Sequence, residues 1–187
     1  MKKLLSFIGL AAALVSTSSF SSDKYQLDPK LSSINFATIK KQYIVESATI
    51  NQLAGTLDDK GTFQITVDLN SVQTGVPIRD TRLKEMFFET AKYPSVQIAG
   101  NINLTKSPKQ LSVPAKVTWF GKTLPIDFPV VIVDGDDYVM ASSYSPVIIN
   151  AASFGIPAEN LAKLSNAVGG IKISNQVPLN FVLVFKK

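Results

Sequence analysis

The sequence predicts an all-β protein, folded as an antiparallel eight-stranded barrel with one or two short helices. Apolar and polar residues alternate along most of the chain, which is the two-residue period of strands that bury one face. Turn-forming sequences such as DDKG at 58–61 and DGDD at 134–137 separate these runs at hairpin spacing. Because there are too few helical segments to cover a broad sheet, the apolar faces must meet one another, as they do in a barrel or sandwich.

The clearest strand is the C-terminal run at 171–186. Seven of its eight odd positions are apolar, against two of its eight even positions, so one face is expected to be buried. Shorter or weaker runs predict seven further strands, one beginning with Ile34 and Phe36 and the others at 44–57, 63–69, 96–104, 111–119, 124–132 and 139–149.

Two segments break the alternation and predict short helices. Residues 79–90 place apolar side chains at helical spacing. Residues 157–165 open with Pro157, which suits a first helical turn, and carry Leu161 and Leu164 before two glycines end the segment. These two helices are expected to plug or cover a mouth of the barrel.

The first 21 residues have the layout of a secretory signal peptide. Lys2 and Lys3 precede a mostly apolar stretch at 4–15, too short to span a bilayer, and small polar residues follow. We expect cleavage after Ser21, which leaves residues 22–187 as a single barrel domain exported to the periplasm. No later run approaches the roughly 18 apolar residues of a membrane helix, so no transmembrane segment is expected after cleavage.

The chain of 187 residues contains no cysteine and no histidine. Their absence excludes Ser-His-Asp and Cys-His catalysis, disulfides, thiolate metal sites and nearly every zinc site. Without Lys2 and Lys3, the 19 basic residues fall to 17 against 14 acidic ones, and they are scattered. Scattered charge is typical of a solvated face, so no nucleic-acid partner is expected. We also expect no catalytic residue, no metal and no cofactor.

The predicted barrel interior is aromatic and aliphatic. An eight-stranded barrel is just wide enough to be filled by its own side chains or to hold one elongated ligand. If the interior stays open, an exported protein with an apolar tunnel is a carrier for a long hydrocarbon chain. The residues expected to line this tunnel are Phe36, Phe63, Leu83, Phe87, Phe88, Tyr93, Trp119, Phe128 and Phe181.

Two arginines beside this cluster are candidates for a polar head group. The guanidinium groups of Arg79 and Arg82 could hold a phosphate or carboxylate at the tunnel mouth through paired hydrogen bonds. The alternative is that Arg79 and Asp80 form structural pairs that pin the helix in place. The sequence leaves both readings open.

An ordered set of motifs resembles the YceI-like family of periplasmic, lipocalin-like, polyisoprenoid-binding proteins. From about Tyr25 onward the motifs are NSVQTG at 70–75, Arg79-Asp80-x-x-Leu83, FF at 87–88, KYP at 92–94, a hairpin at Gly121, FGI at 154–156 and a closing strand that ends in two lysines. The resemblance implies a lipocalin-like barrel around an amphipathic lipid, such as an isoprenoid quinone or prenyl chain, without catalysis. The chain departs from the family at Arg82, where histidine is usual, and at 150–153, where arginine is usual before the Phe-Gly pair.

Three other functions remain open. An outer-membrane barrel is disfavoured by the prolines in or beside the strands and by the final Lys186-Lys187. An enzyme with paired carboxylates would depend on Asp134, Asp136 and Asp137, which a hairpin tip with weak calcium affinity explains better. A filled barrel that serves as an envelope interaction or stress module needs the same apolar face as a carrier. We therefore expect a non-enzymatic carrier of a long-chain isoprenoid or similar lipid, with a homodimer possible.

Overall fold

The computed structural model describes residues 25–104 and 108–187, so the predicted signal peptide at 1–21 lies outside the described residues. The described chain forms one antiparallel sheet with short helices. Its strands are β1 (Tyr25–Leu27), β2 (Ser33–Lys40), β3 (Ile44–Ile50), β4 (Leu53–Leu57), β5 (Thr62–Asp68), β6 (Val72–Gln73), β7 (Ser95–Asn101), β8 (Lys109–Trp119), β9 (Lys122–Asp134), β10 (Tyr138–Ser143), β11 (Val147–Asn150) and β12 (Gln176–Lys186).

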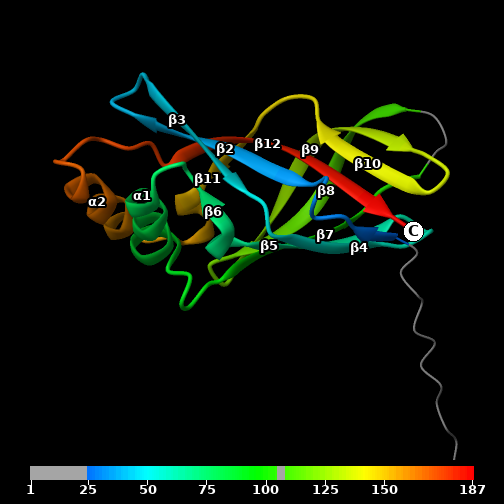
Figure 1. The fold of residues 1–187 in the computed structure, drawn as a ribbon, viewed down its shortest axis with the longest axis horizontal. Coiled ribbons are helices and arrows are strands. Elements are labelled where there is room, and N and C mark those ends of the chain that lie inside the picture. The colour runs from blue at the N-terminus through cyan, green and yellow to red at the C-terminus, as the bar shows by residue number, and fades with distance from the viewer. Residues whose placement is uncertain (1–24, 105–107) are drawn as a thin grey trace, which may run out of the picture.

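Eight of these strands close into a ring, which confirms the predicted barrel. The order around the ring is β1, β4, β5, β7, β8, β9, β10 and β12, and the short strand β1 closes it by pairing with both β4 and β12. The N-terminal half of β12 continues past this closure, with β11 on one edge and β2 on the other. Strand β3 then pairs with β2, so β2 and β3 form a hairpin at the end of the barrel away from the C-terminus (Figure 1).

Two of the expected strands are each divided in the structure. The run 44–57 becomes β3 and β4, separated by the exposed Asn51 and Gln52, where the Asn51 side chain and the Gln52 N–H donate to the side chains of Gln73 and Ser71, respectively. The run 139–149 becomes β10 and β11, because the chain bends before Pro146, which has no N–H to give to a ladder. The last strand begins at Gln176 and not at 171, although Ile173 still forms an isolated bridge with Lys40.

Both predicted helices are present, and they lie together at one end of the barrel (Figure 1). Helix α1 (Pro77–Arg82) runs directly into a π-helix, η2 (Leu83–Phe88), and α2 (Ala158–Ala167) begins directly after Pro157, its N-cap residue. Single 3₁₀ turns occur at η1 (Leu69–Ser71) and η3 (Ala151–Phe154). A π-helix is bonded from i to i+5, so its turn is wider than an α-helical turn. Phe87 and Phe88, four and five residues after Leu83, can therefore both lie on the buried side with it.

The inner face of β12 is the one that the alternation predicts. Phe181, Leu183 and Phe185 are buried in the core. Val184 points to the opposite face, where the alternation predicts exposure, but it is also buried. The β1–β2 connection covers it, and the Val184 N–H donates to the buried Ser32 hydroxyl of that connection at 2.9 Å.

An ion pair ties the β1–β2 connection to the last strand. Asp28 Oδ2 lies 2.9 Å from Lys186 Nζ, and Asp28 Oδ1 accepts the Lys30 N–H at 2.9 Å. The hydrogen bond from Lys186, followed by that from the Lys30 backbone, lowers the pKa of Asp28 below its usual value of 3.8. A lowered native pKa means that the carboxylate stabilises the fold above its unfolded pKa, and that this contribution is lost as the pH falls through the native pKa.

Asp28→Asn is therefore expected to reduce the melting temperature slightly at about pH 7, since it removes the charge and keeps the Oδ1 acceptor. The difference from the unsubstituted protein should shrink as the pH falls below the native pKa of Asp28. Thermal melts of both proteins across acidic pH would check this. A difference that stays constant into strong acid would mean that the ion pair contributes nothing.

Candidate functional site

One continuous cavity of about 200 Å³ runs along the inside of the barrel. One water molecule needs about 10–15 Å³ of such a cavity, so this cavity is more than ten times larger than the site of a single water. Its wall combines side chains from the ring strands with others from η2, η3 and α2. The wall includes Leu57, Phe63, Ile98, Val117, Ile132, Phe154, Leu161, Leu164, Ile173, Leu179 and Phe185.

The wall is almost entirely hydrocarbon. Among the described residues that line the cavity, only Thr38 and Ser174 carry a hydroxyl group. The indole nitrogen of Trp119 is a further potential donor, buried and without a hydrogen-bond partner in the described part of the chain. Water in such a space would find few partners, and cavities of this kind stay dry or take an apolar guest.

The two hydroxyl groups lie at the same end of the cavity. Ser174 N–H donates to the Ile39 carbonyl at 2.8 Å, which places Ser174 beside Thr38 on β2. This is the end at which α1 and α2 lie (Figure 1). Around the other end the wall is formed by Leu57, Ile132 and Phe185. The cavity is therefore polarised, with hydrocarbon along most of its length and hydroxyl groups at the helix end.

Most of the predicted tunnel residues line this cavity. The structure brings together eight of the nine: Phe36, Phe63, Leu83, Phe87, Phe88, Trp119, Phe128 and Phe181. Tyr93 is the ninth, and it is not among the described residues of the cavity wall. Its ring stacks on Phe120 in the β8–β9 turn, with ring centroids 3.9 Å apart.

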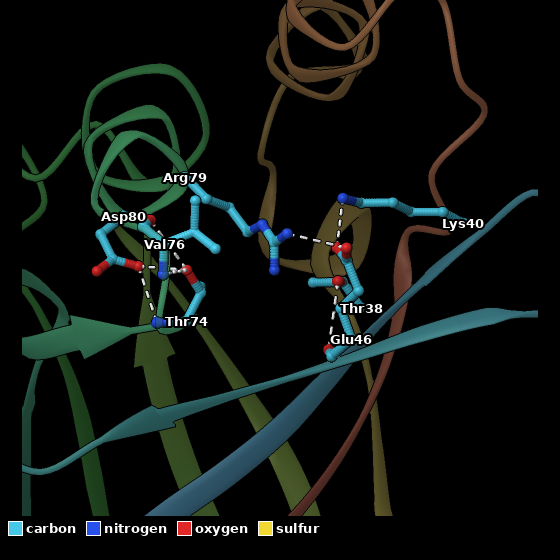
Figure 2. A network of polar contacts seen from close by, with 7 residues as sticks. All are labelled: Thr38, Lys40, Glu46, Thr74, Val76, Arg79 and Asp80. Atoms are coloured by element: carbon cyan, nitrogen blue, oxygen red, sulfur yellow. Dashed lines mark hydrogen bonds and ion pairs between the residues drawn. The ribbon is translucent and has the colours of Figure 1, made fainter.

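The two predicted head-group arginines also lie outside the described cavity wall. Figure 2 shows Arg79 reaching from α1 toward the β2–β3 hairpin, where its Nη2 lies 2.9 Å from Glu46 Oε1. Lys40 pairs with the other oxygen of the same carboxylate. Arg82 is half-buried on the last turn of α1. A role for either arginine in holding a head group stays a prediction, and Arg79 already has a structural partner.

Asp80 holds the start of α1 independently of Arg79. One of its oxygens accepts the Thr74 N–H at 2.8 Å and the Thr74 hydroxyl at 2.6 Å (Figure 2). Because Thr74 precedes the helix and Asp80 lies within it, this contact folds the NSVQTG segment back onto α1. The structure thus supports the reading in which Arg79 and Asp80 pin the helix, each through a different partner.

A family model for the YceI-like domain matches residues 25–185, almost the whole of the described chain. The chain belongs to the YceI-like family. A polyisoprenoid-binding domain from Saccharophagus degradans, implicated in plant cell wall breakdown, aligns with a TM-score of 0.80 and 28% identity over 87% of this chain and 98% of that one. No curated protein sequence matches the chain.

More distant structures share the fold of this YceI-like domain. BcnA of Burkholderia cenocepacia aligns with a TM-score of 0.66 at 17% identity, over 84% of this chain and 98% of its own. The YceI protein of Campylobacter jejuni aligns with a TM-score of 0.51 at 14% identity, over 71% and 82%. At these identities the likeness concerns the fold alone.

Aromatic rings form the wall of the YceI-like cavity near η2. Phe87 and Phe88 have ring centroids 5.5 Å apart, Phe88 meets Trp119 edge-on at 6.0 Å, and Trp119 lies 5.5 Å from Phe154. Sequence reasoning did not place Phe154 in the tunnel. The FGI motif at 154–156 was a signal for it, because Gly155 adopts φ 85° and ends the 3₁₀ turn that carries Phe154 inward.

Helix α2 covers this end of the cavity and is held there by a buried amide. Leu161 and Leu164 line the cavity, while Asn160 is only 2% exposed. The Asn160 Nδ2 donates to the Phe87 carbonyl at 3.2 Å and to Glu89 Oε1 at 2.7 Å. The amide thereby joins α2 to the end of η2.

Asn160→Ala is expected to reduce the free energy of unfolding by about 1–3 kcal/mol, since it leaves the buried Phe87 carbonyl without this donor. Urea unfolding followed by circular dichroism would measure the change. Asn166→Ala is the matched control, because Asn166 lies on the same helix and is exposed. If both variants lose the same stability, the amide contact does not hold α2 in place.

Neither a metal centre nor a membrane-spanning helix is found in the described residues. No group of three or more Asp, Glu, His or Cys side chains within 25–104 and 108–187 is placed to hold a metal ion. Across the same residues, none of the helices combines the length and the apolar character needed to cross a bilayer.

Proposed function

We propose that this YceI-like domain binds a long-chain amphiphile, such as a polyisoprenoid, an isoprenoid quinone or a fatty-acid-like lipid, inside its barrel. The observation that carries the proposal is the continuous cavity of about 200 Å³ with a hydrocarbon wall. The similarity to the Saccharophagus degradans polyisoprenoid-binding domain supports it. The alternative function, an envelope interaction or stress module, assumes a barrel that is filled by its own side chains and has no such cavity.

Burial of the tail alone supplies enough free energy for stable binding. At about 25 cal/mol per Å², roughly 400 Å² of buried hydrocarbon contributes about 10 kcal/mol before the costs of ordering the ligand. Because the tail contacts are non-directional, the domain is expected to accept tails of different chemistry and similar length.

The polarity of the cavity favours one orientation of the ligand. The polar end would lie at the helix end, near Thr38 and Ser174, and the tail would extend toward Leu57 and Phe185. The Thr38 hydroxyl donates to the Glu46 carbonyl at 3.4 Å and the Ser174 hydroxyl to the Gln176 carbonyl at 3.2 Å, so each would meet a ligand as a neutral acceptor, for example of a ligand hydroxyl group. A neutral head group therefore suits this wall better than a charged one.

The predicted signal peptide supports a role in the periplasm. There the domain would carry or store its lipid between membranes or during envelope stress. No catalytic step is proposed, since the described residues of the wall include no pair of acid and base groups.

Native mass spectrometry of the protein purified from its own host tests the proposal. The expected result is a population carrying one lipid, which organic extraction removes and added isoprenoid quinone restores. The proposal fails if the protein carries no lipid after purification and takes up neither a quinone nor a fatty acid after extraction.

A further inference from the structure

Exposed apolar side chains gather at the helix end of the barrel. Nine large hydrophobic residues are exposed in the described chain, and five of them belong to two short segments, 43–45 and 76–78. Tyr43 and Val45 are 77% and 64% exposed at the tip of the β2–β3 hairpin, and Ile78 is 56% exposed on α1. We call Tyr43, Ile44, Val45, Val76 and Ile78 the tip surface.

The two segments of the tip surface are held beside each other. The ion pair between Arg79 and Glu46 joins α1 to the hairpin (Figure 2). On its other side, β3 pairs with β6 only at Thr49 and Ile50, so the outer edge of β3 near the tip has no neighbouring strand in the described chain. The hairpin tip is thus fixed against α1 at Glu46 and carries apolar side chains on both faces of β3, with Ile44 on the Glu46 face and Val45 on the opposite one.

Cations surround the tip surface. Lys41 N–H donates to the Lys172 carbonyl at 2.9 Å, which places both lysines at the hairpin turn, and Lys40 and Arg79 flank Glu46. Four cations therefore stand against two carboxylates, Glu46 and Asp80, and the Asp80 carboxylate is already bonded to Thr74. The turns at the other end of the barrel hold six aspartates and five lysines among the described residues: Asp28, Asp58, Asp59, Asp134, Asp136, Asp137, Lys30, Lys60, Lys109, Lys186 and Lys187.

This combination fits an anionic lipid surface. An aromatic ring and β-branched side chains ringed by lysine and arginine are the residues that enter the boundary between head groups and acyl chains. Each lysine or arginine near an anionic bilayer adds to the attraction. A second copy of this chain is a poorer occupant, because edge-to-edge pairing of two β3 strands would bring the four cations of each copy together.

We propose that the tip surface docks this protein on an anionic phospholipid bilayer. Docking brings the bilayer to the polar end of the cavity, since Thr38 lies two residues before Lys40 on β2. Exchange of a lipid between bilayer and cavity then needs no transit through water. That exchange rests on the proposed function, whereas docking does not.

Flotation with lipid vesicles tests the docking. The purified protein is expected to bind vesicles of phosphatidylcholine with about one quarter phosphatidylglycerol, and to bind pure phosphatidylcholine several-fold less. Raising the salt from about 0.1 M to about 1 M shortens the Debye length from about 10 Å to about 3 Å and should release most of the bound protein. Tyr43→Ser/Val45→Ser and Lys41→Glu/Lys172→Glu should each reduce binding about tenfold.

Leu31→Ser/Tyr138→Ser is the matched control. These residues are 52% and 37% exposed beside Asp28 and Lys186, at the end away from the tip, and their loss should leave vesicle binding unchanged. Equal binding by all variants would overturn the proposal. The proposal would also be overturned if the protein does not float with vesicles and light scattering shows a dimer that Tyr43→Ser/Val45→Ser dissociates. Native mass spectrometry of Tyr43→Ser/Val45→Ser distinguishes the docking proposal from the proposed function. If this variant no longer binds vesicles but still carries lipid in its cavity, docking is lost and the proposed function is intact.

Discussion

Phe181→Asp is expected to abolish the binding of long-chain lipid. The Phe181 ring is 7% exposed, lines the cavity and meets Phe128 edge-on with ring centroids 5.8 Å apart. An aspartate at this position would face hydrocarbon, and the described residues of the cavity wall include no cation to compensate its charge. An unpaired buried charge costs about 3 kcal/mol or more, which corresponds to a loss of more than about a hundredfold in affinity.

Val182→Asp is the matched control for Phe181→Asp. Val182 is the next residue on β12 and faces the other side of the strand, so its carboxylate should leave lipid binding nearly unchanged. Binding would be followed by displacement of a fluorescent fatty acid, with circular dichroism to confirm the fold. Full lipid occupancy in folded Phe181→Asp would show that the ligand lies elsewhere.

A second variant covers the outcome in which Phe181→Asp fails to fold. Ala141 lines the cavity from β10, where it pairs with Ile132 and Leu183. Ala141→Phe adds only hydrocarbon and fills part of the empty space, so the barrel is expected to remain folded while lipid binding falls. Unchanged binding in folded Ala141→Phe would contradict the assignment of the cavity as the lipid site.

The largest expected loss of stability comes from Gly61→Ala. Gly61 has φ +83° in the β4–β5 turn, and a Cβ atom there would lie 1.7 Å from the Ile102 carbonyl oxygen. The Ile102 N–H also donates to the Gly61 carbonyl at 2.9 Å, so the two backbones cannot separate without losing this bond. The expected cost is about 3 kcal/mol or more, from the strained backbone and the displaced contact together.

Gly75→Ala isolates the effect of the clash. Gly75 has a similar φ of +75° but nothing within 4 Å of an added Cβ atom. Its substitution should cost only the backbone strain, about 1 kcal/mol. Urea unfolding of both variants gives the difference. If the two lose equal stability, the close packing of Gly61 on Ile102 does not contribute to the fold.

The sequence predicts the barrel and most of the cavity wall because the alternation of side chains reports directly on the two faces of a strand. Phe63, Phe128 and Phe181 lie in long runs of alternation, and all three line the cavity. Tyr93 lies in a connection between η2 and β7, where no periodicity fixes the direction of a side chain. Its position depends on the distant Phe120, which local sequence does not reveal.

Features that depend on contacts between distant segments could not be predicted. Arg79 lies close in sequence to the tunnel residue Leu83, yet its partner Glu46 comes from the β2–β3 hairpin, 33 positions away. The polar end of the cavity depends on the hydrogen bond from the Ser174 N–H to the Ile39 carbonyl. Ser174 lies before the start of β12, where no strand alternation predicts its position. The tip surface likewise joins two segments, 43–45 and 76–78, whose proximity is a property of the fold.

The three-residue strand β1 has a consequence for how the barrel forms. Leu27 pairs with Phe185, so the ring closes only when the two ends of the described chain meet. Among the strands of the described chain β1 is synthesised first, and it must wait for β12, which is synthesised last. Contacts between such distant residues form slowly, and until then the hydrocarbon wall lies open along a seam. The pairing of β1 with β12 is therefore expected to be the step that finally separates the hydrocarbon wall from water.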